Sequence, residues 1–210
     1  MLGLINYGAG NYRSVCNALE YLNIQYKEIL ESNDFLEVTH IILPGVGAYN
    51  DCINRLKTLN LIDSLERETR NNAKFFLGIC VGHQILSTFG TEFEKTPGLD
   101  LVPGATVRVK GGESLPVPHV GWSEVSQLRP SPLFAGIDDG STFYFVHSYH
   151  LEASYQENVL AVTSYGEEIT AAVNRGNIYG VQFHPEKSQK NGLQLLKNFS
   201  GLNNEQNPCL

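Results

Sequence analysis

The chain has 210 residues, of which 42% are hydrophobic and 18% are charged, and its formal net charge is −7. This length fills one sizeable hydrophobic core but is short for two, so we expect a single domain spanning residues 1–210. The acidic balance excludes nucleic acid as an expected partner, and no apolar run reaches the roughly 18 residues that a membrane span requires.

The first half of the chain alternates predicted strands with predicted helices. Short apolar runs predict strands at Leu2–Asn6, Ile24–Leu30, His40–Leu43 and Lys74–Ile79. Apolar residues at helical spacing predict helices around Val15–Leu22, over Tyr49–Arg70 with a break near Asn60, and over Gly82–Phe89. Strands separated by helices pair in parallel within a sheet that helices cover on both faces.

The second half of the chain has a different pattern. Strand-like runs are present at Ala105–Lys110, Thr142–Val146, Val159–Ser164, Thr170–Asn174 and Ile178–Phe183, with glycine turns at Gly111-Gly112, Gly166 and Gly176-Asn177. A closing helix is expected near Gln189–Phe199. The expected fold class is therefore α/β: a mostly parallel central sheet with helices on both faces and an appended antiparallel β portion.

The cysteines and the N-terminal segment predict the cellular compartment of the protein. The four cysteines have no C-x-x-C spacing, and the N-terminal segment Met1–Ile5 lacks the length and basic flank of a signal peptide. We therefore expect reduced thiols in a cytoplasmic protein. Neither the cysteines nor the histidines have the spacing of metal ligands, so we expect no metal and no cofactor.

The segment Gly78-Ile79-Cys80-Val81-Gly82 contains the first chemical signal. A cysteine between a strand and a helix, with a glycine two residues away on each side, suits a sharp turn that presents the thiol as a nucleophile. The positive end of the following helix favours the thiolate, and its first amides, beginning at Val81, can face an oxyanion. A buried core thiol is the competing interpretation, and it is the preferred one for Cys16, Cys52 and Cys209.

A nucleophilic cysteine needs a base, and the base needs a group that orients it. The segment His184-Pro185-Glu186 supplies both directly after a predicted strand, and the proline restricts the backbone between them. A histidine and a glutamate in a loop are common by themselves. In combination with the cysteine turn they predict a triad of Cys80, His184 and Glu186.

A second glycine turn, Pro44-Gly45-Val46-Gly47, ends another predicted strand. Its amides are free to serve as an oxyanion donor or to bind a carboxylate, and an ordinary strand-to-helix turn is the alternative. It is not a phosphate loop, because the Gly-Lys-Ser/Thr ending is missing. His40 is interpreted as structural, and His147 and His150 as either structural or pocket-lining. His83, in the predicted helix after Cys80, is interpreted as a packed structural side chain, with an influence on Cys80 as the alternative.

Together these motifs resemble the class I (triad) glutamine amidotransferases and, within them, the glutaminase subunits of imidazole glycerol phosphate synthase. The cysteine turn and the His-x-Glu pair are typical of the whole superfamily. The segments that indicate this subunit family are Asn6-Tyr7-Gly8-Ala9-Gly10-Asn11, Pro118-His119-Val120-Gly121-Trp122 and Phe145-Val146-His147-Ser148-Tyr149. The wider resemblance also covers Pro44-Gly45-Val46-Gly47-Ala48 and Gln182-Phe183-His184-Pro185-Glu186-Lys187-Ser188.

The resemblance implies a role for each matching residue. Cys80 would attack the side-chain amide of glutamine, His184 would transfer protons, and Glu186 would orient His184. The expected oxyanion hole consists of the Val81 amide and a peptide of Val46 and Gly47. The other implied roles are substrate binding, by Gln84, Ser148 and Tyr149, and a position near the partner interface, for Asn11, Trp122, Tyr144 and Lys187.

The implied partner is a separate (βα)8-barrel cyclase subunit that uses ammonia on a phosphorylated, ring-opened nucleotide. The resemblance also implies slow glutamine hydrolysis without the partner, and the two glycines of the Pro44–Gly47 turn make a peptide flip cheap when the partner is loaded. An alternative acceptor stays open: related subunits feed an amidine-forming synthase of surface-polysaccharide sugars. A non-catalytic subunit of the same fold is a further hypothesis, which the presence of Cys80 and His184 disfavours.

Three residues depart from the pattern of the family. Asn6 stands where Asp is usual, His83 where Met is usual, and Ser123 where Asn is usual. None is a triad residue, so the glutaminase prediction is unaffected. Asn6 and Ser123 fall in segments assigned to the partner side, so they bear on the identity of the partner.

Overall fold

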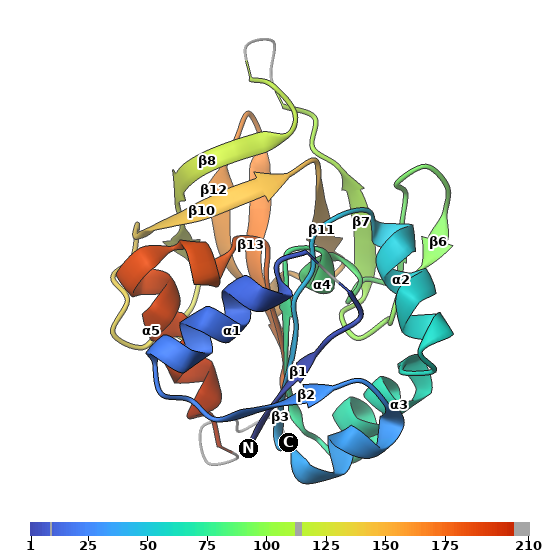
Figure 1. Cartoon of the computed structure of the whole chain (residues 1–210). Coiled ribbons are helices and arrows are strands. Elements are labelled where there is room, and N and C mark those ends of the chain that lie inside the picture. The colour runs from blue at the N-terminus through green and yellow to red at the C-terminus, as the bar shows by residue number, and fades with distance from the viewer. Residues whose placement is uncertain (9, 112–114, 204–210) are drawn as a thin grey trace.

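The computed structural model describes residues 1–8, 10–111 and 115–203 (Figure 1). A central sheet of eight strands has the order β2-β1-β3-β4-β14-β13-β12-β9. In this order the strands are Tyr26–Ile29, Leu2–Ile5, His40–Leu43, Phe75–Ile79, Ile178–Val181, Glu168–Arg175, Val159–Ser164 and Ser126–Gln127. The first five strands pair in parallel, and the last three continue the sheet in antiparallel pairing.

Two smaller sheets lie beside the central one. One is the pair of β8 (His119–Glu124) and β10 (Thr142–His147). The other has the order β11-β7-β5-β6, formed by Tyr149–Ala153, Gly104–Arg108, Phe89–Gly90 and Thr96–Pro97. In Figure 1 the pair β8–β10 lies in the upper part of the molecule, above α1 and α5.

The helices cover both faces of the central sheet. The α-helices are α1 Tyr12–Tyr21, α2 Tyr49–Thr58, α3 Ile62–Glu66, α4 Val81–Gln84 and α5 Gln189–Ser200. The short 3-10 helices are η1 Ser32–Glu37, η3 Pro132–Phe134, η4 Gln156–Asn158 and η5 Pro185–Lys187, and η2 Arg67–Asn71 is a π turn. Helices α1 and α5 lie on one face of the sheet, and α2 and α3 lie on the other (Figure 1). Among the described residues no helix is long and apolar enough to cross a membrane.

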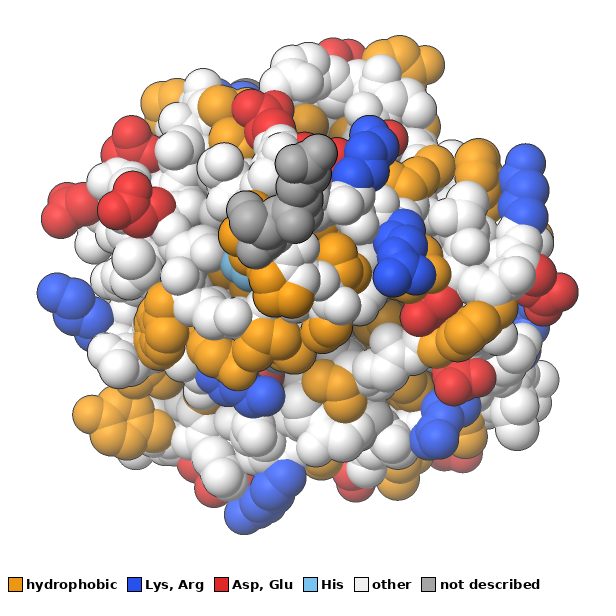
Figure 2. All heavy atoms as spheres, turned by 90° about the horizontal axis from the view of Figure 1, so that it is seen from above, with side chains coloured by type: hydrophobic (Ala, Val, Ile, Leu, Met, Phe, Trp, Pro, Cys, Tyr) orange, Lys and Arg blue, Asp and Glu red, His pale blue; other side chains and the backbone are white. Residues whose placement is uncertain are grey.

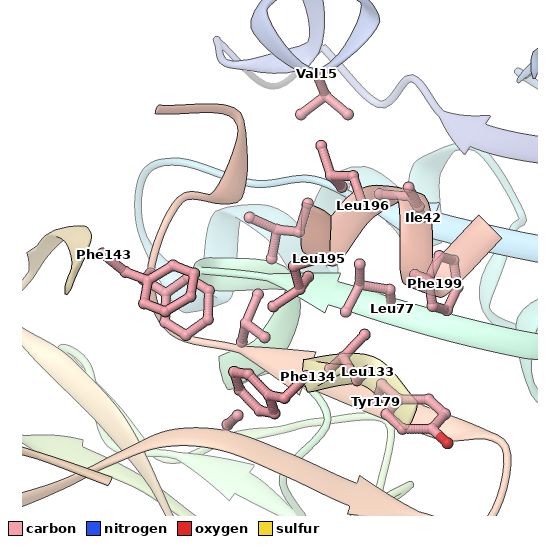
Figure 3. Packing of buried hydrophobic residues seen from close by; sticks show 14 of the residues in the cluster. Val15, Ile42, Leu77, Leu133, Phe134, Phe143, Tyr179, Leu195, Leu196 and Phe199 are labelled. Atoms are coloured by element: carbon pink, nitrogen blue, oxygen red, sulfur yellow. The ribbon is translucent and has the colours of Figure 1, made fainter. Parts of the chain in front are cut away.

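Strand alternation explains why the sheet has a hydrophobic cluster on each face. Successive side chains of a strand point to opposite faces. On β3, Ile41 and Leu43 belong to the cluster that contains α2, whereas Ile42 packs with Val15 of α1 and Leu196 of α5 (Figure 3). Each such fully buried side chain contributes roughly 1.5–3 kcal/mol by leaving water. Burial of this kind on both faces fixes the register of the strands.

The fold class predicted from the sequence is confirmed, with two corrections of detail. The run Ile178–Phe183, predicted within the antiparallel portion, contains β14, which pairs in parallel with β4 and antiparallel with β13. The predicted strands at Ala105–Lys110 and Thr142–Val146 exist and belong to two smaller sheets beside the central one. Their partners are β11 and β8, which were not predicted. Both partners carry polar residues and one contains Gly121, so pairing at long range decides them and local pattern does not. The predicted positions Gly112 and Cys209, and Ala9 of the first turn, lie outside the described residues.

The helix after Cys80 was predicted over Gly82–Phe89 but ends at Gln84. Beyond it the backbone tightens into single turns, in which Leu86 N–H bonds His83 O and Ser87 N–H bonds Gln84 O. The Ser87 hydroxyl also donates to Gln84 O at 2.8 Å, which satisfies a carbonyl that a longer helix would use. The predicted break near Asn60 is confirmed, because α2 ends at Thr58 and Asn60 has a φ of 53°.

Candidate active site

The candidate residues gather where parallel strands end. Strands β1, β3, β4 and β14 run side by side in the same direction, so their carboxyl ends meet at one edge of the sheet. The Pro44–Gly47 turn follows β3, Cys80 follows β4, and Gln182 to Glu186 follow β14. Segments that are about 140 residues apart in the sequence thus share one site through the strand order alone.

Cys80 has the backbone of a strained turn. Its φ is 54° and its ψ is −108°, a region that L-residues rarely adopt. Such a conformation costs on the order of 1–3 kcal/mol and persists where the surrounding structure enforces it. The Cys80 amide donates to Val181 O at 2.9 Å, which ties the turn to β14. The strain presents the thiol at the end of the strand, as in the nucleophile turn of hydrolases.

The two glycines around Cys80 are required by close packing. A Cβ atom at Gly78 would collide with the carbonyl of Gly82, and a Cβ at Gly82 would collide with the carbonyl of Leu43. These contacts involve backbone atoms, which cannot move aside as a flexible side chain can. The glycine spacing noticed in the sequence therefore reflects how tightly the chain folds back on itself at Cys80.

His184 and Glu186 form a buried pair. Both side chains are 0% exposed, and His184 Nδ1 lies 2.8 Å from Glu186 Oε1. A carboxylate only accepts hydrogen bonds, so Nδ1 carries the proton and Nε2 is the ring nitrogen that faces other groups. Nε2 has no hydrogen-bond partner among the described residues. The orientation is held further by the His184 amide, which donates to Tyr144 O at 2.9 Å.

The electrostatics of the pair favour a charged imidazole. Burial by itself lowers the pKa of His184, but the nearby Cys80 sulfur and the Glu186 carboxylate outweigh it and raise the pKa to about 10. At neutral pH His184 is therefore protonated when Cys80 is a thiolate. Such an ion pair is the arrangement that activates a cysteine nucleophile next to a histidine.

A cavity of about 300 Å³ opens beside Cys80. Every residue that the resemblance assigned to the oxyanion hole and to substrate binding lines this cavity. The lining residues are Val46, Gly47, Cys80, Val81, Gln84, Glu92, Pro118, Val146, His147, Ser148 and Tyr149. This volume lies at the small end of ligand pockets and suits a molecule of amino-acid size. Gly47 has a φ of 109°, and nothing lies within 4 Å of a Cβ built there, so the turn over the cavity has room to change conformation.

Gln84 has an orientation that the hydrogen bonds determine. Its Nε2 donates to Tyr149 O at 2.7 Å and to Gln182 Oε1 at 3.2 Å, so both amide protons are used within the protein. The group of Gln84 that remains for a ligand is the acceptor Oε1. An acceptor at this place suits the amide or ammonium protons of a glutamine-like ligand.

Three of the four residues predicted at the partner interface lie together. Trp122 on β8 is opposite Tyr144 on β10, with ring centroids 6.0 Å apart, and Lys187 Nζ lies 5.8 Å from the Tyr144 ring. Trp122 is 47% exposed, and Val120 on the same strand is 56% exposed. Val46, at the cavity, is 38% exposed. Figure 2, which looks down on this end of the molecule, shows hydrophobic side chains gathered there.

Asn11, the fourth predicted interface residue, has a different setting. It is 3% exposed, and its Nδ2 donates to Glu186 Oε1 at 3.2 Å. Asn11 thus donates to the same carboxylate oxygen that accepts the hydrogen bond from His184 Nδ1. Its predicted place at the interface remains a prediction, while its side chain is part of the triad surroundings.

The three departures from the family pattern each have a local setting. Asn6 Nδ2 donates to Glu28 Oε1 at 2.7 Å, a contact that an aspartate would turn into repulsion. Ser123 Oγ lies 2.8 Å from His119 Nε2. His83 is fully buried away from the cavity lining, and burial lowers its pKa to about 3, so it is a neutral packed side chain.

Sequence reasoning missed two residues of the site. Glu92 lines the cavity and accepts a hydrogen bond from the Tyr49 amide at 2.8 Å. Gln182 is fully buried and lies 3.7 Å, through Nε2, from Cys80 Sγ. The sequence signal for Gln182 was its place at the end of an apolar run, in the segment Gln182–Ser188 that carries the family resemblance. In the parts of the chain that the structure describes, no group of three His, Cys, Asp or Glu side chains could hold a metal ion.

The chain is similar to known proteins in both sequence and fold. The family model described as "Glutamine amidotransferase class-I" matches residues 4–201. Among solved structures, one described as a glutamine amidotransferase superimposes with a TM-score of 0.73 at 18% identity, covering 96% of this chain and 99% of that chain. PurLQS from Thermotoga maritima gives 0.70 at 20% identity, covering 94% and 96%. The chain belongs to the class-I glutamine amidotransferase family.

Curated relatives narrow the comparison to one kind of subunit. The chain is 40% identical to the imidazole glycerol phosphate synthase subunit HisH of Syntrophotalea carbinolica, over 96% of this chain and 100% of that protein. It is 43% identical to the subunit of the same name from Geobacter sulfurreducens, over 96% and 98%. The similarity to HisH subunits therefore extends over nearly the whole length of both proteins.

Proposed function

We propose that this chain is the glutaminase subunit of an imidazole glycerol phosphate synthase, which hydrolyses glutamine and passes the ammonia to a (βα)8-barrel cyclase. The observation that carries the proposal is the position of Cys80 beside a cavity of about 300 Å³ and within electrostatic range of the buried His184–Glu186 pair. The names of the full-length relatives support the choice of synthase.

In the proposed reaction the Cys80 sulfur attacks the side-chain amide carbon of glutamine. The carbonyl oxygen becomes an oxyanion, which the Val81 amide and a peptide of Val46 and Gly47 stabilise. The first amides of α4 have no carbonyl partner within the helix, so Val81 is free for this role. His184 gives its proton to the departing nitrogen, ammonia leaves, and a γ-glutamyl thioester remains on Cys80.

The second half of the reaction removes the acyl group. His184, now neutral, accepts a proton from water, and the resulting hydroxide attacks the thioester carbon. The carbon–sulfur bond breaks, glutamate is released, and the Cys80 thiolate and His184 imidazolium are restored. Glu186 keeps Nδ1 protonated throughout, which leaves Nε2 as the nitrogen that transfers protons.

We place the partner on the end of the molecule that carries Trp122, Tyr144 and Lys187. Exposed apolar side chains at this end match what an interface core requires, and exposed Val46 also lines the cavity. Ammonia released beside Cys80 then has the shortest route to a barrel bound there.

The proposal is tested by supplying nitrogen in two ways. The purified chain is mixed with the cyclase subunit of a relative, and imidazole glycerol phosphate is measured with glutamine or with ammonium salt. We expect the glutamine-dependent rate to fall at least about 1,000-fold in Cys80→Ala, with the ammonia-dependent rate unchanged. An unaltered glutamine-dependent rate in this variant would overturn the triad. Glutamine hydrolysis that no such barrel stimulates would favour the sugar-amidination subunit instead.

A further inference from the structure

Gln182 connects the nucleophile to the wall of the cavity. It follows β14 directly, stands two residues before His184, and has a side chain that is 0% exposed. Its Nε2 lies 3.7 Å from Cys80 Sγ, and its Oε1 lies 3.2 Å from Gln84 Nε2. A fully buried amide is retained only where its polar atoms find partners, and both of its partners are residues of the proposed site.

The direction of this contact follows from one backbone carbonyl. Tyr149 O only accepts, so the Gln84 atom at 2.7 Å from it must be the amide nitrogen. The second proton of that nitrogen points to Gln182, so the Gln182 atom that receives it must be the oxygen. The other end of the Gln182 amide, which faces Cys80, is therefore an NH₂ group and donates to the sulfur.

We propose that Gln182 is a positioning residue that donates a hydrogen bond to the Cys80 sulfur and favours its thiolate form, while holding Gln84 Oε1 toward the ligand. A donor gains far more from a charged sulfur than from a neutral thiol, so the contact acts on the balance between the two forms. This proposal rests on the proposed function, because it assigns a helper to the same nucleophile.

Gln182 and His184 act on the sulfur from the same segment but in different ways. His184 changes its charge with pH, whereas the amide of Gln182 is neutral at every pH and donates throughout. The other titratable groups that face Cys80 or its cavity are Tyr7, Cys52, Glu92 and His147. All variants in the test retain these four residues.

The test is the pH dependence of Cys80 alkylation in the full chain without glutamine. Iodoacetamide modification is followed at Cys80 by peptide mass spectrometry in wild type, Gln182→Met and Gln182→Glu. Loss of one hydrogen bond to a charged group is expected to move the alkylation midpoint up by about one pH unit in Gln182→Met. Gln182→Glu is expected to move it further, because it replaces the donor with a negative charge. The kcat/KM for glutamine should fall about 10-fold in Gln182→Met.

A matched control lies at the other end of the same strand. Asn177 precedes β14, and its buried amide donates to Thr69 O at 2.9 Å and to Lys74 O at 2.6 Å. Asn177→Leu removes a buried amide in the same way, so it should lower the unfolding temperature but leave the alkylation midpoint at the wild-type value. A merely structural role for Gln182 predicts the same behaviour for both positions.

Two results would overturn the proposal. One is a wild-type midpoint in a Gln182 variant that keeps the wild-type circular dichroism spectrum. The other is loss of the fold in both Gln182 variants, which would assign the residue to structure alone. The proposed function fails separately, through undiminished glutamine hydrolysis in Cys80→Ala, and the alkylation midpoint does not depend on that hydrolysis.

Discussion

Cys80 lies between two regions of opposite character. On one side, the side chains of His184, Glu186 and Gln182 are fully buried, and hydrogen bonds join His184 to Glu186 and Gln182 to Cys80. Their positions are therefore set before any ligand arrives. On the other side, Val46 and Trp122 are 38% and 47% exposed. Groups that are fixed in advance need no reorganisation during a reaction, whereas exposed apolar groups invite a partner to cover them. We propose that the buried side performs the chemistry and that the exposed side, covered by the partner, governs when it happens.

The largest effect is expected from Glu186→Gln on the buried side. The carboxylate that fixes the proton on His184 Nδ1 is lost, and glutamine turnover should fall about 100- to 10,000-fold. The pKa of His184 should also fall from its raised value of about 10, so the alkaline limb of the pH–rate profile should move to lower pH. Steady-state glutamate release over a pH series checks both expectations.

The same change should alter the pH dependence of stability. A raised pKa means that His184 stabilises the folded state fully below its ordinary value of 6.5, and that this contribution is lost as pH rises through about 10. Urea unfolding at a series of pH values should therefore show a smaller loss between these limits in Glu186→Gln than in wild type. Glu157→Gln, at an exposed carboxylate of η4, is the control and should behave as wild type. An identical pH dependence in all three proteins would contradict the assignment.

On the exposed side, Trp122→Ala should weaken binding of the cyclase barrel. A tryptophan at the centre of an interface typically contributes 2 kcal/mol or more, so Kd should rise about 30-fold by calorimetry. The free energy of unfolding of the isolated chain should change by less than about 0.5 kcal/mol, because the ring is 47% exposed. Tyr155→Ala removes another exposed aromatic residue, at the start of η4, and should leave Kd unchanged. Equal affinities for all three proteins would place the interface elsewhere.

The smallest effect is expected from Asn11→Leu, which tests whether Asn11 belongs to the buried side or to the exposed side. Asn11 was predicted at the interface, yet its side chain is 3% exposed and donates to Glu186. Loss of one hydrogen bond to a carboxylate should lower kcat for glutamine about 10-fold and change the Kd of the barrel less than that. Asn17→Leu, on the exposed side of α1, serves as the control. A larger change in the Kd of the barrel than in kcat would contradict this prediction and would support a role for Asn11 at the interface.

The sequence alone determined the local features of this protein. Glycines at 78 and 82 predicted a tight turn at Cys80, because only glycine tolerates backbone atoms so close. The alternating pattern of the first half predicted parallel strands, and the His-x-Glu spacing predicted an ordered pair, because both depend on residues near each other in the chain. The helix after Cys80 was predicted too long, since the Ser87 hydroxyl ends it by a contact that periodicity does not show.

Only the tertiary structure decided which strands pair and which side chains come into contact when they are far apart in the sequence. The assignment of β7 and β10 to the smaller sheets follows from their partners β11 and β8, and strand pairing is not encoded by the pattern of one strand. Gln182 reads as an ordinary residue at a strand end until β14 pairs with β4 and brings its amide to Cys80. Asn11 likewise reaches Glu186 across 175 residues. Sequence pattern reports which face of an element is buried, whereas the three-dimensional arrangement alone determines which polar groups find each other there.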